Sequence, residues 1–165
     1  GRLMTGTAMR GVMMKGENES VTVTIKGDGP MGTLVAVANH GDVKACADDP
    51  HVELPLREDG KLDVGGAVGH HGRMSVVKDL GLREPYIGQC ELVSGELGID
   101  FANYFTSSEQ QPSLVAVGVL VNEVSIMGVH WIVLWLDREA TGCDEDGIAD
   151  VPVAYSWILL ILYCS

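Results

Sequence analysis

The sequence predicts an α+β fold built mostly of antiparallel strands with few helices. Short segments of alternating or continuous apolar residues follow one another, with tight turns between them, as in successive hairpins. Helical spacing is found in only two segments, so the chain lacks the regular strand–helix–strand alternation of a parallel sheet. Its 165 residues, 46% of them hydrophobic, suffice for one domain with a substantial core.

The first segment with helical spacing lies at the N-terminus. Its apolar residues are Leu3, Met4, Ala8, Val12 and Met13. The spacing is interrupted by Gly6 and Gly11, which favours a core helix that packs closely against its neighbours. A methionine-rich, adaptable binding stripe is the alternative interpretation.

The stretch SVTVTIKGDGPMG predicts a half-buried strand followed by a turn. Val21, Val23 and Ile25 alternate with polar residues, which is the period of a strand. The glycines that follow are Gly27, Gly29 and Gly32. They are interpreted as turn residues and not as a phosphate-binding loop, because neither a helix nor a Lys-Ser/Thr pair follows. The segments TLVAVAN and VKACA predict two more strands around the turn HGD.

Three further segments complete the pattern before the second helix. DDPHVELPL is expected to be extended because of Pro50 and Pro55. KLDVGGAVG and RMSVVKDLG flank HHG, which predicts a hairpin with His70 and His71 at its tip; adjacent side chains there point in opposite directions and do not share a metal ion. PYIGQCELV predicts another strand.

The second helical segment, LVSGELGIDFANYFTSSEQ, is followed by a strand. Ser94 is expected to cap the helix, and Glu96 and Asp100 to interact favourably with its dipole. Its apolar face comprises Leu97, Phe101, Tyr104 and Phe105, which are expected to be buried against the sheets. Pro112 prevents the helix from continuing. SLVAVGVLV, which contains Gly118, predicts a central strand covered on both faces.

The serines and carboxylates of this helical segment do not form the pattern of an active site, and no catalytic residue is assigned. Acyl transfer requires a serine paired with an oriented histidine, but Ser94 lies in S-G-E and not in a G-x-S-x-G turn. Ser107 and Ser108 are at the end of the helix. Glu96 and Glu109 would lie roughly 20 Å apart along a helix, too far for a glycosidase carboxylate pair. The chain is therefore not expected to be an enzyme.

Metal and thiol sites are likewise not expected. Asp48, Asp49, His51 and Glu53 were considered as metal ligands, and a solvent-facing loop is the favoured interpretation. The cysteines are Cys46, Cys90, Cys143 and Cys164. None of them forms a CxC or CxxC pair, so no zinc ligand and no redox disulfide is assigned, and buried or incidental thiols in a reducing cytoplasm are expected.

The charge balance argues against two kinds of partner. The chain has 11 Lys and Arg against 23 Asp and Glu, a net charge of -12. Nucleic acids and anionic membranes attract basic proteins, so neither is expected to bind. GRLMTGTAMRGVMMKG lacks the continuous apolar region of a signal peptide. The apolar run in VPVAYSWILLILYCS is too short to span a bilayer.

Several stretches together resemble a known family. KLDVGGAVG, VVKDLGLREPYIGQ, LVSGELGIDFANYF and SSEQQPS...GVLV, with IKGDGPMG and DPHVELPL, follow one another between Gly1 and Val121 in the order and spacing of the redox-regulated 33-kDa bacterial heat-shock chaperone (heat-shock protein 33). The resemblance implies β-sheets packed around helices, in β/α/β layers. It also implies a cytoplasmic, ATP-independent holdase for unfolded client proteins, often dimeric, in which oxidation of a Cys₄ zinc domain releases a linker.

The resemblance divides the chain in two. Residues 1–123 correspond to the chaperone core domain, with its first strand and helix expected to be missing before Gly1. Residues 124–165 diverge and contain no zinc domain, so no cofactor is expected. A reading-frame shift near Val124 is one interpretation, because Gly128-Val129-His130-Trp131 read one base later can encode Gly-Phe-Ile, as the family expects. A lineage-specific strand pair, with WIVLWL in place of the lost strand, is the alternative.

These observations predict a holdase without a redox switch, a member of a stress-response family. The alternative is an inactive structural fragment of the chaperone that binds no client. The sequence does not indicate where the client-binding surface lies, because apolar residues of a core face and of a binding face look alike.

Overall fold

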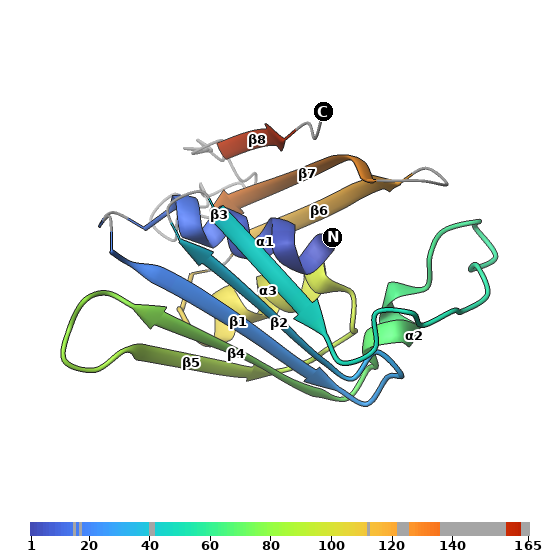
Figure 1. Cartoon of the computed structure of the whole chain (residues 1–165), viewed down its shortest axis with the longest axis horizontal. Helices are drawn as coiled ribbons and strands as arrows, with labels where there is room; N and C mark the ends of the chain where they lie inside the picture. The colour runs from blue at the N-terminus through green and yellow to red at the C-terminus, as the bar shows by residue number, and fades with distance from the viewer. Residues whose placement is uncertain are drawn as a thin grey trace, which may run out of the picture.

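Two antiparallel sheets enclose the two longer helices. The computed structural model describes residues 1–14, 16, 18–39, 42–111, 113–121, 126–135 and 158–162. Helices α1 (Arg2–Val12) and α3 (Leu97–Ser107) lie between the sheets (Figure 1). Helix α1 contacts strands of both sheets, and α3 contacts β5 of one and β6 of the other. The predicted α+β fold, with sheets packed around helices, is confirmed.

The larger sheet has five strands in the order β3-β2-β1-β4-β5. Their bounds are β1 Ser20–Gly27, β2 Thr33–Asn39, β3 Asp42–Ala47, β4 Gly72–Asp79 and β5 Tyr86–Glu91. On its inner face the predicted apolar residues Val21, Val23 and Ile25 have no exposed surface. The strands predicted in these segments are confirmed, and the alternation of apolar and polar residues determines which face each side chain occupies.

The smaller sheet has three strands in the order β6-β7-β8. They are β6 Ser113–Val121, β7 Ile126–Trp135 and β8 Ile158–Leu162. Within the described part of the chain β6 pairs only with β7, and Leu114 is 58% exposed. The prediction of a central strand covered on both faces was therefore wrong, because a continuous apolar run does not distinguish a central strand from an edge strand that packs on a helix.

The helices supply most of the aromatic core. Phe101, Tyr104 and Phe105 of α3 are almost completely buried, together with Leu97, as the sequence predicts. Burial of each such side chain contributes about 1.5–3 kcal/mol. Gly6 of α1 lies against the ring of Phe101, and a Cβ atom at this position would collide with the ring. The prediction of a core helix with close-packed glycines is confirmed.

The hairpin predicted around His70 and His71 is not formed. The preceding residues fold into a short helix, α2 (Val64–Val68), and not into a strand. Asp63 caps it, since its Oδ1 accepts a hydrogen bond of 3.0 Å from the backbone N–H of Gly66. Gly69 then reverses the chain at φ 96°, a conformation that favours glycine. The prediction missed the Asp cap because it relied on apolar spacing alone.

Several predictions fall outside the described residues. These are the turn residues His40 and Gly41, the helix-ending Pro112, and the thiols of Cys143 and Cys164. Within the predicted tail, residues 124–165, the described residues form β7 and β8. The division at residue 123 and the frame shift near Val124 both stay predictions.

Candidate functional site

The loop before α3 is held by the carboxylate of Asp100 and not by a serine cap. Asp100 Oδ1 accepts hydrogen bonds from the backbone N–H groups of Val93 (2.9 Å) and Ser94 (3.1 Å), and Asp100 is fully buried. The helix begins at Leu97 with Glu96 at the cap position, so the prediction that Ser94 caps α3 was wrong. Burial raises the pKa of Asp100 above its usual range.

Glu96 and Glu109, considered above as a carboxylate pair, instead form separate ion pairs. Glu96 binds Arg2 at 2.5 Å and Arg57 at 3.1 Å. Glu109 binds Arg10 at 2.9 Å and, on the same oxygen, Lys78 at 2.5 Å. Both carboxylates are thus engaged in links between distant parts of the chain, which is a structural role.

The Glu109 network is mostly buried and joins three elements. The side chains of Arg10, Lys78 and Glu109 are 8%, 16% and 9% exposed. The guanidinium of Arg10 lies 5.2 Å from the centre of the Phe105 ring, and the ammonium of Lys78 lies 4.8 Å from that of Tyr86. Desolvation lowers the pKa of Lys78, although the nearby Glu109 opposes this effect. The members of the Glu109 network are far apart in the sequence, so no local sequence pattern could have predicted it.

The other polar residues considered as ligands have local partners. Asp48 Oδ2 accepts a hydrogen bond of 2.7 Å from the N–H of Thr33, and Asp49 Oδ1 accepts one of 2.9 Å from that of His51. His70 Nδ1 lies 2.7 Å from the carbonyl oxygen of Ser94. Among the described residues no three His, Cys, Asp or Glu side chains are grouped so that they could hold a metal ion.

The two described thiols are free and differ in environment. Cys46 is exposed on β3, and Cys90 is half-buried on β5. Burial, reinforced by the charge of Asp100, raises the pKa of Cys90 to about 11. The Cys90 thiolate, the reactive form, is therefore scarce at neutral pH.

An apolar stripe crosses the outer face of the five-stranded sheet. Backbone pairing aligns Val37 of β2 with Thr22 of β1, Thr22 with Val77 of β4, and Val77 with Ile87 of β5. Val37 is 39% and Ile87 58% exposed. Three inter-strand spacings make this apolar stripe (Val37, Thr22, Val77, Ile87) roughly 14 Å long. Finding it requires the strand register, which the sequence does not provide.

The turn between β4 and β5 extends this apolar surface. Leu80 and Leu82 in the turn are 37% and 69% exposed. Exposed leucines are common individually, but two of them in the turn that follows β4, together with an apolar stripe that no described element covers, indicate an interaction surface.

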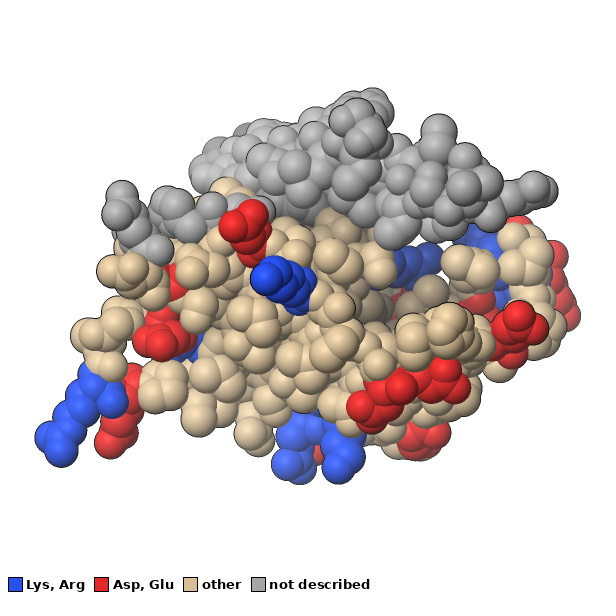
Figure 2. All heavy atoms as spheres, viewed as in Figure 1, with Lys and Arg blue, Asp and Glu red and all other residues tan. Residues whose placement is uncertain are grey.

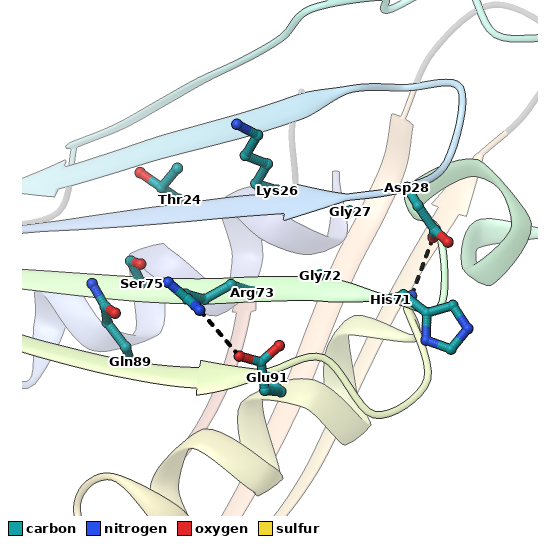
Figure 3. A pocket seen from close by; sticks show the side chains of 10 residues that line it. All are labelled: Thr24, Lys26, Gly27, Asp28, His71, Gly72, Arg73, Ser75, Gln89 and Glu91. Atoms are coloured by element: carbon teal, nitrogen blue, oxygen red, sulfur yellow. Dashed lines mark hydrogen bonds and ion pairs between the residues drawn. The ribbon is translucent and has the colours of Figure 1, made fainter.

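A polar pocket of about 530 Å³ lies further along the same sheet face (Figure 3). Its lining includes Lys26 of β1 and Arg73 of β4, which face each other across the strand pair. Thr24, Ser75 and Gln89 form the next row, between these cations and the apolar stripe. Asp28 lies at the end of the pocket, where its carboxylate accepts a hydrogen bond of 3.1 Å from the N–H of His71.

The charged side chains of the described residues are dispersed on the face shown in Figure 2. Figure 2 shows acidic and basic side chains in small separate groups on the described part of the visible face, with uncharged surface between them. None of the described helices has the length and apolar character needed to cross a membrane.

Together these features describe an α+β core that carries an apolar stripe on the outer face of its larger sheet. Comparison with known proteins gives the family. The model of the Hsp33 protein family matches residues 1–132, and the chain belongs to this family, as the sequence resemblance indicates. It is a family of chaperones, and its model extends past the predicted boundary at residue 123.

Individual relatives agree with the family assignment. The 33 kDa chaperonin of Bacillus subtilis is 58% identical over 160 residues, which cover 96% of this chain and 54% of the relative. That of Thermoanaerobacter pseudethanolicus is 57% identical over 124 residues, 74% of this chain and 42% of the relative. The crystal structure of the 33 kDa chaperonin (heat shock protein 33 homolog) of Thermotoga maritima superposes with a TM-score of 0.75 at 38% identity, covering 92% of this chain and 53% of that one. The chain thus spans about half the length of these relatives.

Proposed function

We propose that this chain is an ATP-independent holdase that binds unfolded or partly unfolded proteins and prevents their aggregation. The observation that carries the proposal is the uncovered apolar stripe in a chain of a chaperone family. Unfolded proteins expose apolar side chains, and burying these against Val37, Val77 and Ile87 removes apolar surface from water on both partners. No catalysed reaction is proposed.

The stripe suits a short extended client segment. The stripe runs across the strands for roughly 14 Å, so an extended client segment that follows the strand direction crosses it with a few aliphatic side chains. Such a contact is small, so single contacts are expected to be weak and exchangeable, as a holdase that releases its clients requires. The chain is proposed to act in the cytoplasm, and a homodimer would present two stripes and strengthen binding by avidity.

The activity is proposed to need neither zinc nor oxidation. None of the cysteines in the sequence occurs as CxC or CxxC, the pattern of the family's zinc site. Cys90 is poorly ionised, and no partner for a disulfide with Cys46 is seen among the described residues. Peroxide and chelators are therefore expected to leave client binding unchanged.

The test is a light-scattering assay of a heat-unfolded client protein. The chain should suppress aggregation, and the double variant Val37→Ser/Ile87→Ser should suppress it several-fold less. Leu56→Ser is the matched control, because Leu56 is 61% exposed but lies between β3 and α2, outside the stripe. Equal loss in both variants would place client binding elsewhere, and no suppression by the unaltered chain would favour an inactive fragment.

A further inference from the structure

The cation pair beside the apolar stripe has too few anionic partners on this face. Lys26 and Arg73 are directly opposite on β1 and β4, where like charges destabilise a strand pair. Arg73 has one partner, Glu91 at 3.3 Å, and this ion pair is exposed at both ends. Within the described part of the chain Lys26 makes no ion pair. Asp48, whose carboxylate accepts a hydrogen bond from the N–H of Thr33, interacts with the charge of Lys26 without forming an ion pair. The repulsion between the two cations is therefore offset only in part, which directs attention to a ligand.

The rest of the pocket supplies hydrogen-bond donors near the two cations. Thr24, Ser75 and Gln89 lie across three strands in one row, and none of their side chains forms a hydrogen bond with another described residue. Hydroxyl and amide groups can donate to an anion that also binds the cations. In Figure 3 the Arg73 side chain extends along β4 toward Ser75, and so toward the apolar stripe.

The acidic side chains that line the pocket do not occupy the space beside the two cations and the polar row. The Asp28 carboxylate is held at the far end of the pocket by the backbone N–H of His71, away from the polar row (Figure 3). Glu91 is 72% exposed at the sheet edge and contacts only the Arg73 side of the pair. The space beside Lys26, Thr24 and Ser75 is therefore available to an external anion.

We infer that this pocket binds carboxylate side chains of the client, so that the sheet face prefers extended segments in which an acidic residue stands near aliphatic ones. The inference rests on the proposed client binding at the apolar stripe. On each strand the cation row lies four residues from the stripe, or about 13 Å. The long Lys26 and Arg73 side chains shorten that distance. In a client segment that runs parallel to the strands, the acidic residue therefore lies two to four positions from the aliphatic ones.

The preference also compensates for the overall charge. The chain carries a net charge of -12, which repels acidic unfolded proteins at long range. A local pair of cations beside the apolar stripe allows such segments to bind in spite of that repulsion. Because the cations are exposed, the effect is modest, about two- to fivefold in affinity, as for other exposed ion pairs.

The experiment compares two labelled peptides by fluorescence anisotropy at low salt. Both peptides carry the same aliphatic residues. Three positions after these residues, one peptide has two aspartates and the other has two asparagines. The unaltered chain should bind the aspartate peptide about two- to fivefold more tightly. In Lys26→Gln/Arg73→Gln the two affinities should become equal or reversed. In Arg57→Gln/Lys61→Gln, which changes the net charge equally outside this pocket, the preference should remain.

The outcomes separate the two proposals. Equal binding of both peptides by the unaltered chain overturns the carboxylate preference alone, as does a preference that survives Lys26→Gln/Arg73→Gln. Absence of binding by both peptides overturns client binding at the stripe and the preference with it. Circular dichroism of each variant checks that it is folded. The Val37→Ser/Ile87→Ser variant should lower the affinity for both peptides by the same factor.

Discussion

Replacing Glu109 by alanine leaves two largely buried cations without their shared carboxylate. Arg10 and Lys78 are 8% and 16% exposed, and in the described residues Glu109 is the acidic side chain that pairs with both. Removing one member of a buried ion pair costs about 3–5 kcal/mol, because the remaining charge stays desolvated. At about 2–4 °C per kcal/mol for a chain of this size, Tm should fall by about 6–20 °C.

Urea and thermal unfolding followed by circular dichroism measure this loss. Glu91→Ala is the matched control, since it also removes one carboxylate from an ion pair, but that pair is exposed at both ends. The control should lose less than about 1 kcal/mol. If Glu109→Ala and Glu91→Ala lower the free energy of unfolding equally, the buried network does not stabilise the contact of α1 and β4 with the segment that follows α3.

Three further predictions concern packing, titration and thiol chemistry. Gly6→Ala should destabilise by about 1–3 kcal/mol in urea unfolding, because its Cβ would collide with Phe101; a gain in stability would contradict that contact. Burial raises the pKa of Asp100, so the folded state keeps this proton to higher pH than the unfolded chain does. Stability should therefore fall as pH rises from about 4 through the raised pKa, and Asp100→Asn should flatten the fall; an unchanged slope would refute this. Alkylation at pH 8, followed by peptide mass spectrometry, should modify Cys46 well before Cys90, whose pKa is about 11; equal rates would be inconsistent with its burial.

Local patterns in the sequence predict those parts of the fold that depend on local periodicity. The alternation around Val23 and the helical spacing of Phe101 and Tyr104 correctly predict which side chains are buried. The same patterns predict the wrong structure where a helix cap or the pairing register of the strands determines it. Asp63 turns a predicted strand into α2, and β6 pairs, among the described strands, only with β7.

The candidate surface could not be predicted in the same way. Val37, Val77 and Ile87 lie on three different strands, and only the register aligns them. The partners of Glu109 come from α1 and β4, far away in the sequence. The family resemblance indicates what kind of protein this is, but only the arrangement of the sheet shows which side chains lie on the proposed client-binding surface.

The most direct test of holdase activity is light scattering of a heat-unfolded client with increasing amounts of the chain, with and without prior peroxide. Suppression of aggregation to the same extent under both conditions is the expected result, since client binding is assigned to the apolar stripe and not to a thiol switch. Suppression that appears only after oxidation would contradict that assignment, and no suppression under either condition would contradict client binding itself.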